Sequence, residues 1–178
     1  MAQQFSEISS EMTEFIHKQK VFFIGTADDD GRVNISPKGS DSLRVLGSNR
    51  VVWMNLTGSG NESAAHMMAN NRLTIMFCSF EEKPMILRLY GSGIIIHPGN
   101  AEWDELSKLF PDKIGARQFF DIAVDLVQTS CGFQVPYYDY MGERDMLDKW
   151  TERRGRAGIE QYWGEGNRRS IDGKPTGI

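Results

Sequence analysis

The stretch Pro84-Met85-Ile86-Leu87-Arg88-Leu89-Tyr90-Gly91-Ser92-Gly93-Ile94-Ile95-Ile96-His97 decides the fold. Pro84 cannot donate a ladder hydrogen bond, so it is typical of the start of a strand. The apolar residues that follow predict a strand from Met85 to about His97. Gly91 and Gly93 interrupt this strand, which indicates a bulge or a strong bend. Such a bend in a long strand is what a closing β-barrel requires.

The rest of the chain repeats the pattern of short strands separated by turns. Asp28-Asp29-Asp30-Gly31 is a turn by composition, and it predicts a β-hairpin with an acidic tip between the strands on either side. Apolar spacing predicts helices at 6–18, 62–70 and 103–110. Seven β segments with only short helices between them favour an antiparallel barrel over a βαβ fold. Besides the strand above, the predicted strands are 21–26, 32–38, 42–46, 51–56, 73–78 and 119–129.

The C-terminal part of the chain has a different pattern. Apolar residues at helical spacing lie on both sides of Gly155 and Gly158, and they predict two amphipathic helices. Residues 170–178 show no periodicity, so we expect them to be a loosely held tail. These patterns divide the chain into a barrel domain with an N-terminal helix, residues 1–136, and a helical extension packed on the barrel or dimer, residues 137–178.

Composition limits the classes of function. The 178 residues include 20 Lys and Arg against 24 Asp and Glu, which gives a net charge of −4. A nucleic-acid-binding protein normally has a basic excess, so we expect no nucleic-acid partner. No apolar run is long enough to span a membrane, and no secretory signal follows Met1. With only two cysteines there is no disulfide framework, and we expect a cytoplasmic protein without membrane partners.

The usual catalytic and metal-binding motifs do not occur in the sequence. The three histidines, His17, His66 and His97, are far apart, and no His or Cys pair has zinc-ligand spacing. There is no Gly-x-Ser-x-Gly nucleophile motif. The sequence therefore predicts neither a metal site nor a catalytic side chain.

One strand carries an unusual polar face. Within residues 32–38, the side chains of Arg32, Asn34, Ser36 and Lys38 share one side. This face could be exposed to water, or it could bind a polar ligand. The pattern favours neither interpretation over the other. Pro37 favours an edge strand, because proline removes a ladder donor.

A glycine loop leads into the helix predicted at 62–70. Free N–H groups at a helix start attract anions, and Gly58 and Gly60 permit close approach of a phosphate. Asn61 could equally be a plain N-cap, with the glycines serving only as a turn. The carboxylate of Glu62 repels an anion, so cations must come from elsewhere. The candidates are Lys38, Arg72, Arg88 and Arg117.

These motifs together resemble the pyridoxamine 5′-phosphate oxidase-like FMN-binding split-barrel family, over roughly residues 10–165. The resemblance rests on their order and spacing, and the last two of the segments below resemble one uncharacterised bacterial branch of the family. The segments that carry it are Asn34-Ile35-Ser36-Pro37-Lys38-Gly39, Val52-Trp53-Met54-Asn55, Gly58-Ser59-Gly60-Asn61-Glu62-Ser63, Asn70-Asn71-Arg72-Leu73-Thr74-Ile75-Met76-Phe77, Ile86-Leu87-Arg88-Leu89-Tyr90-Gly91, Val127-Gln128-Thr129-Ser130-Cys131-Gly132-Phe133 and Gly142-Glu143-Arg144-Asp145.

The resemblance implies a mainly β fold: a six-stranded antiparallel split β-barrel with short flanking helices and a helical C-terminal extension. It also implies a homodimer with FMN in a groove between the subunits. The strand at 34–38 would run along the flavin ring and ribityl chain, the loop at 59–63 would contact the phosphate, and Arg88 would lie near the ring. The implied cofactor-binding residues are Asn34, Ile35, Ser36, Pro37, Lys38, Met54, Asn55, Ser59, Gly60, Asn61, Ser63 and Arg88.

Two departures from the true oxidase argue against vitamin B6 oxidation. The oxidase has a basic pair where this chain has Gly60-Asn61, and it ends in an Arg-rich segment that residues 172–178 do not match. The resemblance therefore implies an FMN-dependent oxidoreductase with another small-molecule electron donor or acceptor. The alternatives are a non-catalytic flavin-binding protein, a deazaflavin-dependent relative, or a haem-binding relative that would need His66 or His97 as an axial ligand.

Overall fold

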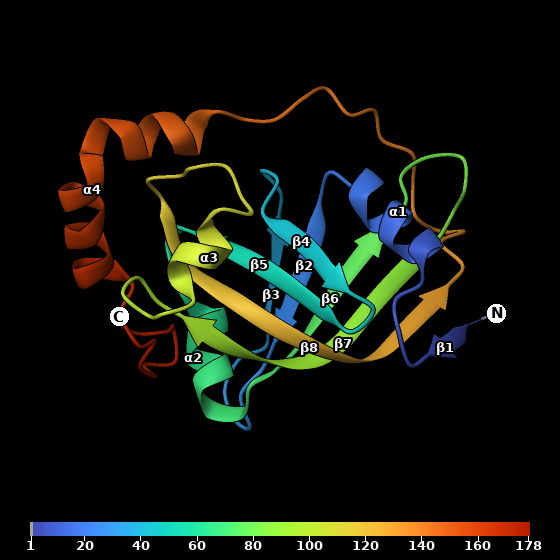
Figure 1. Ribbon diagram of the computed structural model, residues 1–178, viewed down its shortest axis with the longest axis horizontal. Coiled ribbons are helices and arrows are strands. Elements are labelled where there is room, and N and C mark those ends of the chain that lie inside the picture. The colour runs from blue at the N-terminus through green and yellow to red at the C-terminus, as the bar shows by residue number, and fades with distance from the viewer. Residues whose placement is uncertain (1) are drawn as a thin grey trace.

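The computed structural model describes residues 2–178, and it shows an antiparallel eight-stranded sheet that curls into a split barrel with flanking helices (Figure 1). The order along the sheet is β3-β2-β6-β7-β8-β5-β4, and β1 pairs with β8 outside this path. The predicted architecture is confirmed, with eight strands in place of the expected six. The strands are β1 Gln3–Phe5, β2 Phe22–Thr26, β3 Asn34–Lys38, β4 Leu43–Gly47, β5 Arg50–Leu56, β6 Arg72–Cys78, β7 Ile86–Ile96 and β8 Ala116–Ser130.

The long strand β7 bends where the glycines predict. It pairs with β6 on one side and with β8 on the other, and its register against β8 shifts between Tyr90 and Gly91. A Cβ atom on Gly91 would lie 2.1 Å from the carbonyl oxygen of Ala123. Only glycine allows this approach, so the residue type itself permits the bend.

The N-terminal segment departs from the prediction of a helix from residue 6. Helix α1 runs from Ser10 to Lys18, and the Ser9 hydroxyl caps it by accepting the Met12 N–H at 3.2 Å. Residues Gln3–Phe5, which lie before the predicted helix, form β1 and pair with β8. Helix α2, Glu62–Asn70, matches the prediction, while α3, Trp103–Ser107, is shorter than expected.

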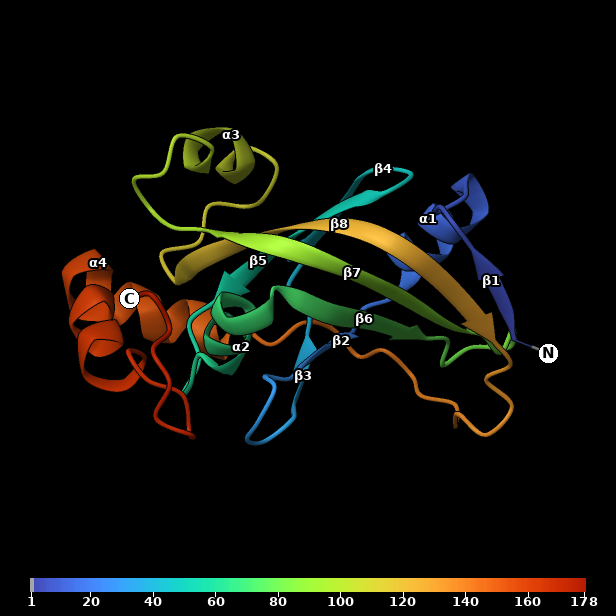
Figure 2. The ribbon, with the colours of Figure 1, turned by 90° about the horizontal axis from the view of Figure 1, so that it is seen from below.

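Two apolar clusters hold the barrel together. The larger cluster includes α1 and the inner faces of the strands, where the rings of Trp53 and Phe120 stack with centroids 4.6 Å apart. The smaller cluster lies under α3, around the buried ring of Phe119. Figure 2 shows that α3 and the β2–β3 hairpin lie on opposite sides of the sheet. Across residues 2–178, no helix has the length and apolar character that a membrane crossing needs.

The C-terminal extension begins with a long connection from β8 that runs back along the molecule to helix α4, Met146–Gly166 (Figure 1). Gly155 has φ 65° and ψ 173°, so it breaks α4 into two helices, as the glycine spacing predicts. The division of the chain at residues 136 and 137 stays a prediction.

The expectation of a loose tail was wrong. The Lys174 ammonium binds the carboxylates of Asp28 and Asp30, and Asp172 binds Arg32. The side chain of Thr176 is fully buried. Ion pairs and single polar contacts hold this tail, and such contacts leave no periodic pattern in a sequence.

Candidate anion-binding site

A cavity of about 410 Å³ lies between β3, the loop before α2 and the C-terminal tail. We call it the polar pocket, because most of its lining is polar. It brings together eight of the residues that the resemblance implies, from segments far apart in the chain. Its lining residues are Arg32, Val33, Asn34, Ser36, Lys38, Asn55, Gly58, Ser59, Gly60, Asn61, Glu62, Ser63, Arg117 and Ile171.

Strand β3 turns its polar side toward this pocket. Asn34, Ser36 and Lys38 are half-buried, whereas Ile35 on the opposite face is 70% exposed. This is the reverse of an ordinary edge strand, which buries its apolar side. The polar face of β3 is thus the less exposed of its two faces.

Hydrogen bonds fix the wall that β3 contributes. The Asn34 amide donates to the Ser63 hydroxyl at 3.2 Å and to the Thr26 hydroxyl at 3.3 Å. The Ser36 hydroxyl in turn donates to Asn34 Oδ1 at 3.0 Å. The bond to Ser63 ties β3 to the start of α2, and the bond to Thr26 ties it to β2.

The loop before α2 carries unsatisfied polar groups. Asn61 is almost fully buried, but its side chain does not cap the helix. Its Oδ1 accepts from Asn55 Nδ2 at 3.3 Å, while its own Nδ2 has no partner among the described residues. A buried donor without an acceptor is costly, so this loop fits a ligand that supplies acceptor oxygens.

A half-buried lysine and a buried arginine line the same pocket. Burial and the nearby Arg117 lower the pKa of Lys38 to about 8, and its ammonium lies 5.3 Å from the centre of the Trp53 ring. Burial also lowers the pKa of Arg117 to about 10. Neither side chain forms an ion pair with a carboxylate within residues 2–178. Buried charges are normally paired, so this arrangement calls for an anion.

Glu62 lines the polar pocket, and its carboxylate is hydrogen-bonded to the C-terminal tail. Both of its carboxylate oxygens accept the Ile171 N–H, at 3.1 and 3.0 Å. The C-terminal tail thus engages this charge at the rim of the pocket. The N–H groups at the start of α2 add the positive end of the helix dipole to the two cations.

The remaining implied residues lie elsewhere. Ile35 and Arg88 line a cavity of about 560 Å³ on the other face of β3, where Arg88 Nη1 donates to the Ser130 hydroxyl at 3.2 Å. Pro37 and Met54 line a third cavity of about 220 Å³. One chain therefore does not bring these four residues into the polar pocket.

The sequence did not single out every lining residue. Arg117 was one of four candidate cations, and nothing in its neighbourhood distinguished it from the other three. Ile171 lies in the tail, whose sequence shows no pattern at all. The described residues contain no cluster of three or more His, Cys, Asp or Glu side chains that could hold a metal ion.

Comparison with known proteins identifies the family. The family model of pyridoxamine 5′-phosphate oxidase matches residues 8–131. A pyridoxamine 5′-phosphate oxidase family protein of Aspergillus flavus, ustO, is 33% identical over 189 residues, which cover 96% of this chain and 76% of that protein.

Two solved structures share the fold at low sequence identity. A variant of HupZ from Group A Streptococcus superposes with a TM-score of 0.57 at 21% identity, over 69% of this chain and 99% of that one. HutZ, the heme storage protein of Vibrio cholerae, superposes with a TM-score of 0.50 at 15% identity, over 71% of this chain and 98% of that one. The match of the family model and the fungal relative together show that the chain belongs to the pyridoxamine 5′-phosphate oxidase family.

Proposed function

We propose that the protein binds FMN in the polar pocket and works as an FMN-dependent oxidoreductase. The observation that carries this proposal is the pair of cations in the lining, the half-buried Lys38 and the buried Arg117, which have no acidic partner among the described residues. The FMN phosphate is a dianion at neutral pH, and its oxygens would accept from both side chains and from the start of α2.

The other lining groups suit the rest of the cofactor. Asn34 and Ser36 present an amide and a hydroxyl along β3, and such groups can bond the ribityl chain and the ring edge. The flavin supplies the electron chemistry when bound, while the protein supplies binding and orientation.

We further propose that the protein is a homodimer. Val33, just before β3, and Ile35, on its outer face, are each 70% exposed, and both line the cavity that holds Arg88. Exposed apolar side chains on an edge strand are typical of an interface. A second subunit would cover this face, and Arg88 of one subunit would then reach a cofactor bound by the other.

The haem alternative receives no support from the histidines. His66 is buried, and its Nδ1 lies 3.1 Å from the Thr26 hydroxyl. Neither His66 nor His97 lines the polar pocket. An axial ligand would have to come from outside this lining.

The absorption spectrum of the purified protein, with any extracted cofactor identified by mass, tests the proposal. We expect flavin bands and FMN, and we expect Lys38→Met to bind added FMN roughly tenfold more weakly. Lys83→Met, which removes an exposed lysine outside the pocket, is the matched control and should leave binding unchanged. A Soret band, or no flavin uptake at saturating FMN, would contradict the proposal.

Turnover separates an enzyme from a storage protein. The FMN-loaded protein is mixed with reduced nicotinamide donors and a panel of acceptors, and flavin reduction is followed by absorbance. Reduction and reoxidation over many cycles would support an oxidoreductase. Tight FMN binding without turnover by any donor would favour the non-catalytic alternative.

A further inference from the structure

One residue of the C-terminal extension, Asn167, forms hydrogen bonds to lining residues of the polar pocket. Asn167 is the C-cap of α4 and is completely buried. It lies beyond residues 8–131, which the family model matches. Its side chain does not line the cavity itself, so any part it plays in binding passes through its neighbours.

The Asn167 amide uses both of its ends. Its Oδ1 accepts from Nη1 of Arg117, which also donates to the Gly60 carbonyl at 3.1 Å. Its Nδ2 donates to the carbonyl oxygens of Gly58 at 3.2 Å and Ser59 at 3.5 Å. One amide therefore connects the buried guanidinium to the loop that precedes α2.

The chemistry of an amide suits this position. An aspartate here would pair with Arg117, neutralise its charge and compete with an anion for the guanidinium. Asn167 supplies the acceptor without the charge, so the cation stays available. The Arg117 Nε has no hydrogen-bond partner among the described residues, which leaves that edge of the guanidinium able to donate to a ligand.

We propose that Asn167 is a positioning residue that holds Arg117 and the glycine loop in the geometry that accepts the FMN phosphate. The C-terminal extension thereby completes the anion site that the barrel begins. This inference rests on the proposed binding of FMN. We expect recognition of the phosphate, rather than binding of the flavin in general, to depend on Asn167.

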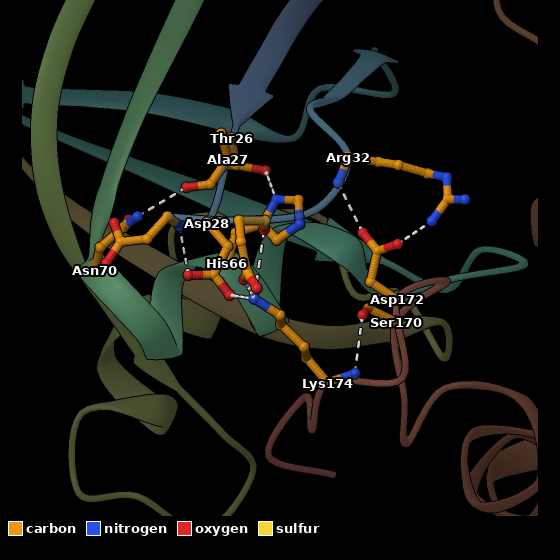
Figure 3. A network of polar contacts seen from close by, with 11 residues as sticks. Thr26, Ala27, Asp28, Arg32, His66, Asn70, Ser170, Asp172 and Lys174 are labelled. Atoms are coloured by element: carbon orange, nitrogen blue, oxygen red, sulfur yellow. Dashed lines mark hydrogen bonds and ion pairs between the residues drawn. The ribbon is translucent and has the colours of Figure 1, made fainter.

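The tail that follows Asn167 is fastened over the same site. The Asn167 carbonyl accepts the Thr176 hydroxyl at 2.5 Å, and the Ile171 N–H binds Glu62 at the pocket rim. Figure 3 shows Asp172 against Arg32 and Lys174 reaching toward the β2–β3 hairpin. These contacts keep the end of α4 from pulling away from the loop.

The test compares FMN with riboflavin, which lacks the phosphate. Dissociation constants for both are measured on wild type, Asn167→Ala and Asn167→Asp. We expect each variant to lose roughly tenfold in FMN affinity, the size of one charge-assisted hydrogen bond, with little change for riboflavin. Inorganic phosphate should also compete less well with FMN in both variants.

Asn49→Ala is the matched control. The Asn49 amide also donates to two carbonyl oxygens, those of Ser6 at 2.7 Å and Val124 at 2.9 Å, but it lies outside the polar pocket. We expect this variant to lose stability yet keep the wild-type preference for FMN over riboflavin. Circular dichroism and thermal unfolding of all variants show that each is folded when titrated.

The outcomes separate the two proposals. If wild type binds neither FMN nor riboflavin, the proposed function fails. If wild type prefers FMN and Asn167→Ala keeps that preference in full, the proposed function stands and the role of Asn167 is refuted. An equal loss of affinity for FMN and riboflavin would also refute it, because a general disturbance of the fold does not discriminate the phosphate.

Discussion

Lys38 shows how the pocket changes the charge state of a single residue. It is the last residue of β3, and burial and Arg117 together make its charged form unfavourable. The cost of keeping this ammonium charged is offset when an anion arrives, because the anion restores the lost electrostatic partner. Because the pKa of Lys38 is lowered, the binding of an anion should depend on pH.

We predict that FMN affinity falls as pH rises through about 8, the pKa of Lys38 in the ligand-free protein. The charged lysine binds the phosphate and the neutral amine does not, so affinity should drop by up to roughly tenfold per pH unit well above that value. The phosphate stays a dianion over this range, since its second pKa is about 6. Fluorescence titration between pH 7 and 9.5 measures this dependence, and Lys38→Met should abolish most of it.

The same residue gives a prediction for the ligand-free protein. The pKa of Lys38 is lowered on folding, so between about 8 and its ordinary value of 10.5 the unfolded chain binds more protons than the folded one. The Lys38 contribution to the free energy of unfolding should therefore rise with pH in this window. Urea unfolding of wild type and Lys38→Met should converge as pH increases. A difference that stays constant with pH would contradict the assignment.

At the scale of elements, β3 and the loop before α2 show how the site is built. The strand alternates as strands do, but its polar side faces inward because Ser63 and Thr26 offer hydrogen bonds there. The apolar side faces outward, where the proposed second subunit would cover it. One face of this edge strand would thus contact the ligand, and the other face would contact the second subunit.

The bend of β7 gives a prediction about stability. Gly91→Ala would place its methyl group against the Ala123 carbonyl oxygen, so β7 and β8 would have to separate. We expect a loss of about 2–3 kcal/mol in the free energy of unfolding, as for other overpacked sites. Gly47→Ala is the control, since a Cβ there meets nothing within 4 Å. Equal stability of the two variants in urea unfolding would show that the bend does not need glycine.

At the scale of the whole molecule, the proposed dimer has a direct test. Ile35→Asp places a charge on the outer face of β3, and we expect it to convert a dimer into a monomer in size-exclusion chromatography with light scattering. Leu109→Asp is the control, because it introduces the same charge on an exposed apolar residue near α3, on the other side of the sheet (Figure 2). A monomeric wild-type protein at micromolar concentration would rule out the shared cofactor site.

Seven of the eight strands and the bend of β7 could be predicted from the sequence, whereas β1 could not. Alternation within each strand and the glycines of β7 act locally, and local backbone preferences are readable from neighbouring residues. The polar residues of β3 and the glycine loop before α2 could be recognised for the same reason. Each of these features occupies a few consecutive positions.

Which of the candidate cations share a pocket, and what holds them there, depends on contacts between distant parts of the folded chain. Arg117 lines the same pocket as Lys38, although the two lie 79 residues apart in the sequence. Arg117 also donates a hydrogen bond to Asn167, which lies 50 residues further along the chain. The tail is likewise fixed by ion pairs to the distant β2–β3 hairpin. Single polar contacts between remote segments follow from the curvature of the sheet and the path of the chain, and neither leaves a periodic trace in the sequence.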